Sequence, residues 1–199
     1  MIAVIRSVGE RTESECARLL PCEAVVIHEK PFVSAVRRCF EIGIDSGEDW
    51  LLTVDADVLT HPGAVEALLE DAGDSFQCQG RVDDKLSGTV RDGGHRLYRI
   101  DFLPIALRML RDAVRVETDV VLRMDAEGYP RRKSRVVCGK HDYEQWYRDL
   151  YRKGGQHAKK FRHEPWPHRW KASDDMDLQA AYAGWHGLPF YVPEKEPMC

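Results

Sequence analysis

Two carboxylates at the end of an apolar run are the residues of this sequence best suited to chemistry. The run Trp50–Leu59 is largely aliphatic and β-branched, and it carries Asp55 and Asp57 near its end. Such a run predicts a strand buried on both faces. In an extended strand, side chains two positions apart point to the same face. Two like charges held together favour a hard divalent cation such as Mg2+ or Mn2+, which often brings a phosphate with it. A metal–diphosphate site at a strand end is therefore expected.

Alternating strand and helix patterns must position these carboxylates. The elements expected before the acidic strand are a strand at 3–5, a helix at 12–20, a strand at 24–27 and a helix at 32–43. This order predicts an α/β domain whose parallel, helix-covered sheet binds ligands at the carboxyl ends of its strands. No GxxxxGK[ST] motif occurs, and the glycines are too few for a dinucleotide fingerprint, so both of those nucleotide-binding classes are disfavoured.

The second part of the chain has weaker patterns. We expect short strands at 76–79 and 96–100, helices at 101–110 and 116–129, a strand at 135–138, a helix at 141–152 and a short helix at 177–183. Lys153, Gly154 and Gly155 begin a basic stretch that we interpret as a flexible loop able to close over a diphosphate.

Length and composition limit the possibilities. The 199 residues fit one domain with one core. No run of about 18 apolar residues is present, so no membrane span is expected. The N-terminus has no signal-peptide pattern, and a cytoplasmic protein is expected. The six cysteines form no CxxC pair, which predicts reduced, mostly buried thiols.

The net charge of −4 is unevenly distributed. Residues 131–171 hold 13 lysines and arginines against 4 acidic residues, whereas residues 1–130 hold 15 against 24. The basic segment could hold the anionic end of a substrate, and a solvated basic surface is the alternative. A nucleic-acid partner is not expected, because the first part of the chain is acidic.

Three motifs follow these elements in order. They are Asp55-Ala56-Asp57, then Glu117 to Arg123 followed by Gly128-Tyr129, and then Gly139 to Tyr143 with His141. Together with the element order, they resemble glycosyltransferases of the GT-A fold, closest to the family 2-like enzymes, over roughly residues 3–150. The resemblance implies one Rossmann-like domain over 1–199 with a mostly parallel central sheet flanked by helices. Residues 1–100 would bind the nucleotide sugar, and 101–199 would bind the acceptor and complete the metal site.

The resemblance also implies roles for single residues. Asp55 and Asp57 match the DxD motif that binds metal and diphosphate, and His141 matches a late histidine that completes a Mn2+ or Mg2+ sphere. His157 and His163 are the alternatives. Glu117 falls at the position of the base that deprotonates the acceptor, although Val116 replaces the first acid of the pair.

The remaining assignments complete the predicted site. The candidate catalytic residues are Glu117 and Asp119; the candidate donor-binding residues are Ser7, Arg11, Glu29, Asp55, Lys153 and Lys159; the candidate acceptor-binding residues are Gly94, His95 and Trp170. Several of these residues also fit a purely structural role. Two acids at a helix N-terminus stabilise the helix dipole, a surface ion pair would occupy Arg11, and burial in the core is the alternative for a tryptophan.

The sequence therefore predicts a metal-dependent glycosyltransferase that uses a nucleotide sugar, with a UDP- or GDP-sugar expected, and an unidentified acceptor hydroxyl. Inversion is expected, but the broken acid pair also leaves a retaining mechanism open. A sugar-nucleotidyltransferase is one alternative, which would need a glycine-rich, arginine-bearing loop after the first strand, where only Gly9 occurs. A non-catalytic nucleotide-sugar binding module is another, and it needs no base at Glu117. A zinc site from Cys138 and the histidines fits no familiar spacing.

Overall fold

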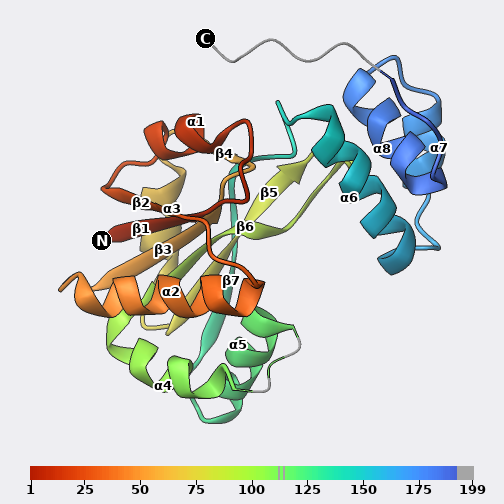
Figure 1. Ribbon diagram of the computed structural model, residues 1–199. Coiled ribbons are helices and arrows are strands. Elements are labelled where there is room, and N and C mark those ends of the chain that lie inside the picture. Colours follow the sequence, from red (N-terminus) through yellow and green to blue (C-terminus); the bar gives the residue numbers. More distant parts are fainter. Residues whose placement is uncertain (112, 114, 192–199) are drawn as a thin grey trace.

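A seven-stranded mixed sheet lies at the centre of the computed structural model, which describes residues 1–111, 113 and 115–191 (Figure 1). The strands are β1 (Ile2–Arg6), β2 (Ala24–Ile27), β3 (Trp50–Asp55), β4 (Val58–Thr60), β5 (Gln77–Asp84), β6 (Thr89–Arg99) and β7 (Arg131–His141). The helices are α1 (Glu13–Arg18), α2 (Phe32–Asp45), α3 (Ala64–Ala72), the short 3-10 helix η1 (Ile100–Phe102), α4 (Leu103–Met109), α5 (Val116–Ala126), α6 (Tyr147–Lys160), α7 (Trp166–Lys171) and α8 (Met176–His186).

The strand order is β2-β1-β3-β6-β5-β7-β4. The first three strands are parallel, as the βαβαβ pattern predicts. Beyond them β6 is antiparallel to both β3 and β5, β7 is parallel to β5, and β4 is antiparallel to β7. The α/β fold class is confirmed, and the sheet is mixed because β6 returns along β5 as a hairpin, which reverses the strand direction.

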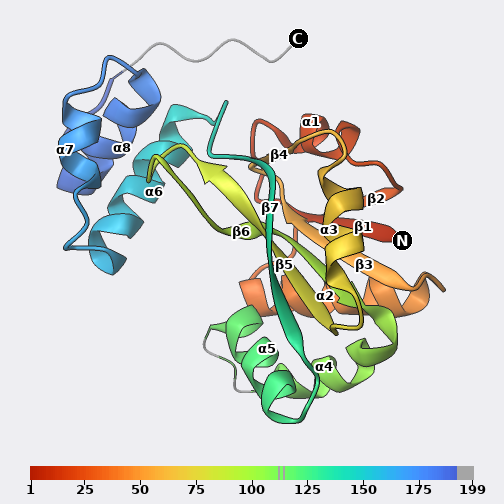
Figure 2. The ribbon, with the colours of Figure 1, turned by 180° about the vertical axis from the view of Figure 1, so that it is seen from behind.

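Alternating side chains of the central strands pack into two hydrophobic layers, one on each face of the sheet. In β1, Val4 packs into the layer under α2, α4 and α5, while Ala3 and Ile5 face the layer under α1 and α3. In β3, Leu51 and Leu52 divide in the same way. Figure 1 shows α2 in front of the sheet, and Figure 2 shows α3 covering the opposite face. Strands that are buried on both faces account for the continuous apolar runs in the sequence.

The region 76–100 is more regular than its sequence predicts. In place of two short strands, β5 and β6 form a long hairpin, with a register irregularity between Gln79 and Arg81. The outer part of the hairpin carries polar side chains on both strands, so it lacks the apolar alternation by which strands are recognised. Main-chain pairing and cross-strand ion pairs, such as that of Arg81 with Asp92 at 3.8 Å, stabilise it instead.

The basic stretch that we expected to be a loop is helical. Helix α6 begins at Tyr147, not at His141, and it includes Lys153, Gly154 and Gly155. These glycines let α6 approach α8 closely: a Cβ at Gly154 would lie 2.0 Å from the Ala181 carbonyl oxygen. Tertiary contact with α8 therefore overrides the low helix propensity of the glycine pair.

Helices α6, α7 and α8 form a group with its own hydrophobic cluster beside the tip of the β5–β6 hairpin (Figure 1). Leu86 from the hairpin turn is fully buried in this cluster. The indole N–H of Trp170 donates to the Leu86 carbonyl oxygen at 2.6 Å. The hairpin therefore connects the helical group to the sheet.

Two composition-based expectations can be compared with the structure. None of the helices in the described residues is long and apolar enough to cross a membrane. The five cysteines within those residues are free thiols, four of them buried, and Cys199 lies outside them.

We expect Gly154→Ala to destabilise the protein by about 1–3 kcal/mol, because the new methyl group would overlap the Ala181 carbonyl oxygen. Gly155→Ala is the matched control in the same helix, where the nearest atom, the Gly184 carbonyl oxygen, lies 3.2 Å from the new Cβ. Chemical denaturation measures both variants. Equal stability of the two would contradict the close α6–α8 packing.

Candidate functional site

Asp55 and Asp57 have different partners, although they are two residues apart. Strand β3 ends at Asp55, and Ala56 and Asp57 form a turn before β4. Thr12 holds this turn through a hydrogen bond from its hydroxyl to the Ala56 carbonyl oxygen at 2.7 Å. The expectation that both carboxylates share one strand face is wrong, because the extended chain stops between them. Asp55 contacts Arg6 at 2.9 Å, and Asp57 faces β7 and α6.

The pairing of β4 with β7 brings Asp57 to His141 and Asp142. In this antiparallel register Val58 lies opposite His141, and the Asp142 N–H donates to the Asp57 carbonyl oxygen at 3.2 Å. Gly139 makes the approach possible, since a Cβ there would lie 2.4 Å from the Leu59 carbonyl oxygen. His141 therefore ends a strand at the sheet edge, and its Nε2 is 3.6 Å from the Asp57 carboxylate.

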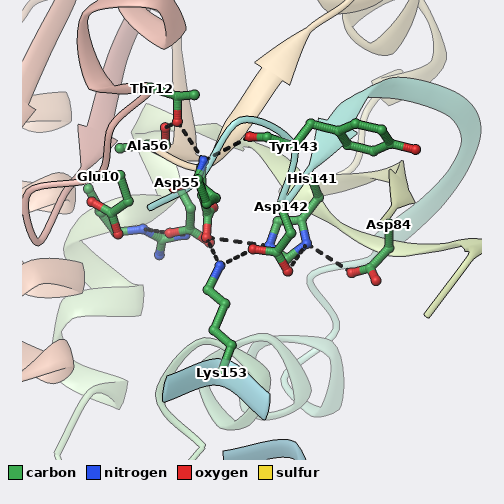
Figure 3. A network of polar contacts seen from close by, with 12 residues as sticks. Glu10, Thr12, Asp55, Ala56, Asp84, His141, Asp142, Tyr143 and Lys153 are labelled. Carbon is green, nitrogen blue, oxygen red and sulfur yellow. Dashed lines mark hydrogen bonds and ion pairs between the residues drawn. The ribbon is translucent and has the colours of Figure 1, made fainter. Parts of the chain in front are cut away.

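Lys153 joins the two aspartates of this cluster. Its ammonium group donates to Asp57 Oδ2 and to Asp142 Oδ1. Figure 3 shows the Lys153 side chain pointing toward Asp142. Asp57 and Asp142 are 6% and 0% exposed. Burial alone would raise the pKa of Asp57, but Lys153 and His141 outweigh it and lower that pKa. Burial acts in the opposite sense on Lys153, whose pKa the two carboxylates nevertheless raise.

His141 extends the cluster to the β5–β6 hairpin. Its Nδ1 lies 2.8 Å from the Asp84 carboxylate and 3.2 Å from Asp142. Arg91 also binds Asp84, at 2.6 Å. Burial opposes the charged imidazole, yet the carboxylates of Asp142, Asp57 and Asp84 raise the pKa of His141 to about 9. Without a metal ion, the ring is therefore a cation at neutral pH.

Glu117 belongs to a second network, around Arg6. The Arg6 guanidinium is 2.7 Å from Glu117 and 2.9 Å from Asp55, and Arg96 approaches Glu117 at 3.5 Å. Burial would raise the pKa of Glu117, but the two arginines lower it below its ordinary value. The carboxylate is thus ionised, as a base must be, and both of its oxygens face arginine side chains.

A pocket of about 170 Å3 opens at the carboxyl ends of β1, β2 and β3. Its lining residues are Arg6, Ser7, Val8, Glu10, Ile27, Glu29, Lys30, Phe32, Ala35, Asp55 and Asp57. Phe32 is 49% exposed as a residue, and the Arg6 guanidinium carbon lies 5.1 Å from its ring centroid. Asp57 lines this pocket and also belongs to the cluster around Lys153. The two features are therefore parts of one site.

The chemistry of the cluster fits a divalent ion. Asp57, His141 and Asp142 each offer a ligand atom, and these atoms lie within 4.8 Å of one another. Asp57 Oδ1 and Asp142 Oδ2 are buried and have no hydrogen-bond partner among the described residues. Two carboxylate oxygens with an imidazole suit Mn2+ or Mg2+. Asp55 lies outside this group because it turns toward Arg6.

The structure separates several predicted residues from the pocket. Arg11 forms an ion pair with Glu144 at 3.1 Å. Asp119 accepts a hydrogen bond from the Arg115 N–H at the start of α5, and Lys159 is exposed in the last turn of α6. Ser7 and Glu29 do line the pocket.

Two of the three residues expected to bind the acceptor, His95 and Trp170, are enclosed by protein, and Gly94 is half-buried. His95 and Trp170 are 0% exposed. His95 bonds to the Thr60 hydroxyl at 2.8 Å, and burial lowers the pKa of its imidazole to about 3. Gly94 packs against Val82, whose Cγ1 would be 2.3 Å from an added Cβ. In this structure neither His95 nor Trp170 presents a surface to an acceptor.

Sequence reasoning missed several residues of the site. Among them are Arg6, Lys30, Phe32, Asp84 and Asp142. A charged residue that ends a buried strand is a signal for Arg6, and the acid directly after His141 is a signal for Asp142. Asp84 has no such signal, because only the parallel register of β5 with β7 brings it opposite His141.

No known protein family and no curated protein matches this chain. Solved structures do. A glycosyltransferase involved in the glycosylation of the major capsid of PBCV-1 has a TM-score of 0.47 and 12% identity, over 67% of this chain and 81% of its own. A 4-diphosphocytidyl-2C-methyl-D-erythritol synthase from Anaerococcus prevotii has a TM-score of 0.49 and 8% identity, over 68% and 88%. A protein from Desulfovibrio desulfuricans that is provisionally described as a nucleotide-diphospho-sugar transferase has a TM-score of 0.46 and 11% identity, over 90% of this chain and 96% of its own. These likenesses concern the path of the chain, and the reactions in the names differ.

We expect Arg6→Met to destabilise the protein by about 3–5 kcal/mol, because Glu117 would lose its closest counter-charge inside the protein. Arg18→Met is the matched control, since Arg18 pairs with Glu15 at the surface and is 67% exposed; its stability should equal that of the wild type. Urea denaturation followed by circular dichroism compares the three proteins. A stable Arg6→Met variant would show that Glu117 does not depend on this pair.

Proposed function

We propose that this protein is a transferase that takes a nucleotide-diphosphate sugar and moves the sugar to an acceptor hydroxyl. The observation that carries the proposal is the position of Asp57. It lines a pocket at the carboxyl ends of three parallel strands and also belongs to a buried acidic cluster with the ligand set for a divalent ion. A nucleoside diphosphate has the matching chemistry, because an aromatic base and a sugar are joined to a charged diphosphate.

The pocket offers a partner for each part of a nucleotide. The exposed Phe32 ring is a stacking surface for a base. The Glu29 carboxylate at the end of β2 can accept hydrogen bonds from ribose hydroxyls. Lys30 and Arg6 supply positive charge for phosphate oxygens. The carboxyl ends of β1 and β2 thus place Arg6, Glu29 and Lys30 along the same pocket.

Asp57, His141 and Asp142 would hold the divalent ion. When bound, Mn2+ or Mg2+ neutralises the charge of the leaving nucleoside diphosphate. The protein's own contribution is to fix these three groups through the β4–β7 register and to keep them away from bulk water. A neutral His141 is required in that state, since a metal ligand must be deprotonated.

Glu117 stays the predicted base for the acceptor. Its ionised, buried carboxylate supports the assignment, and its contacts with Arg6 and Arg96 favour a structural role. A sugar-nucleotidyltransferase would use the same pocket and metal group without a base for a sugar hydroxyl. The products distinguish the two reactions, because glycosyl transfer releases nucleoside diphosphate and nucleotidyl transfer releases pyrophosphate.

We expect UDP or GDP to raise the melting temperature of the wild type in the presence of Mn2+, and Asp57→Asn to remove most of that increase. A panel of nucleotides with and without Mn2+ in a thermal-shift assay measures this. Asp74→Asn, in an exposed loop, is the control and should respond as the wild type does. A variant at Asp57 that keeps the full Mn2+-dependent shift would remove Asp57 from the metal site.

Glu117→Gln should lower turnover of the donor by about 100-fold or more while nucleotide binding persists, if the carboxylate removes the acceptor proton. The amide preserves the shape of the side chain, but it loses the charge that faces Arg6. Release of nucleoside diphosphate measures turnover, and a denaturation curve checks folding. Unchanged turnover by a folded variant would exclude Glu117 as the base. If that variant were also less stable than the wild type, the role of Glu117 would be that of a counter-charge for Arg6.

A further inference from the structure

Lys153 occupies the place between two carboxylates where a metal ion would sit. Its ammonium group contacts Asp57 and Asp142, which are also the two carboxylates of the candidate metal group. We propose that Lys153 is a tethered cation that competes with the divalent ion for this site, so that metal binds only when Lys153 leaves. The proposal deepens the metal-binding part of the proposed function and does not depend on which group is transferred.

The way in which Lys153 satisfies the carboxylates supports competition. It uses one oxygen of each, Asp57 Oδ2 and Asp142 Oδ1. The second oxygen of each is buried and lacks a hydrogen bond among the described residues. Within the described part of the chain, Lys153 thus leaves Asp57 Oδ1 without a partner, while Asp142 Oδ2 has only the His141 imidazole, at 3.2 Å. A divalent ion with several coordination positions would use both oxygens.

Charge also makes simultaneous binding costly. Without metal, Lys153 provides the closest positive charge to both aspartates. A divalent ion beside a retained ammonium group would place two cations against each other in a buried site, where repulsion is weakly screened. Removal of the ammonium group allows the ion to neutralise both carboxylates alone.

Packing within the helical group fixes the backbone of Lys153, while the side chain of this residue can still move. Gly154, the next residue, is packed against the Ala181 carbonyl oxygen, so α6 cannot shift toward α8 at this point. The lysine side chain has a flexible four-carbon stem and keeps 17% exposure. A change of rotamer therefore suffices to vacate the site, and no movement of the helix is needed.

The experiment measures Mn2+ binding without nucleotide, by calorimetry and by the electron paramagnetic resonance signal of free Mn2+. Lys153→Met should bind Mn2+ at least about tenfold more tightly than the wild type, because the competing charge is gone. Lys153→Arg keeps the charge and should not gain affinity. Lys160→Met, which changes an exposed lysine of the same helix, should leave the Mn2+ affinity equal to that of the wild type.

A second readout uses stability. Without metal, Lys153→Met should melt at a lower temperature than the wild type, because two buried carboxylates lose their counter-charge. Mn2+ should then raise the melting temperature of this variant more than that of the wild type. If the variant is insoluble without metal, Lys153→Gln, which keeps a hydrogen-bond donor but no charge, replaces it with the same expectations.

Equal or weaker Mn2+ affinity in the uncharged variants would overturn the proposal, since the lysine would then not occupy the metal position. This result is separable from failure of the proposed function. A protein that shows the expected Mn2+ pattern but binds no nucleotide would retain the lysine proposal and lose the transferase. If the protein binds nucleotide with Mn2+ but the Lys153 variants bind Mn2+ as the wild type does, the lysine proposal is lost and the transferase proposal is retained.

Discussion

Two buried aspartates that meet at the edge of the sheet impose the main electrostatic constraint on this protein. Asp57 and Asp142 are almost completely removed from water, and ionised carboxylates cannot remain there without counter-charge. Lys153 and His141 supply it. These side chains come from three parts of the chain, the turn before β4, the end of β7 and α6, so the fold around the site must bring β4, β7 and α6 together for the charges to balance.

This requirement couples the helical group to the sheet. Lys153 lies on α6, which packs closely on α8, and the group also holds the hairpin turn through Trp170 and Leu86. Asp84 at the end of β5 then binds His141. Polar contacts and hydrophobic contacts therefore both join the helical group to the sheet. Displacement of the lysine by a metal ion would remove only one of the polar links, so the helical group could stay docked by the ion pairs of Lys85 and by its buried aromatic and aliphatic contacts.

The turn after β3 gives two neighbouring acids different partners. Asp55 contacts Arg6, which in turn neutralises the buried Glu117. Asp57 is left for the cluster on the opposite side of the turn. Because Arg6 and Asp55 both line the pocket, the Arg6 network forms the pocket wall, and the Asp57 cluster supplies the candidate metal ligands. A motif of two aspartates thus contributes to the site in two ways, only one of which places a residue among the candidate metal ligands.

The sequence alone determined the α/β class and the first three parallel strands, and it singled out Asp57 and His141, because apolar periodicity and the position of charges at strand ends are local properties. It did not predict the long β5–β6 hairpin, whose polar strands lack that periodicity, or the helical state of Lys153 and its neighbouring glycines, which depends on contact with α8. The enclosure of His95 and the divergence of Asp55 from Asp57 also arise from tertiary structure. A residue type and its spacing state which chemistry is available, whereas partners distant in sequence decide which atoms are buried, paired or left for a ligand.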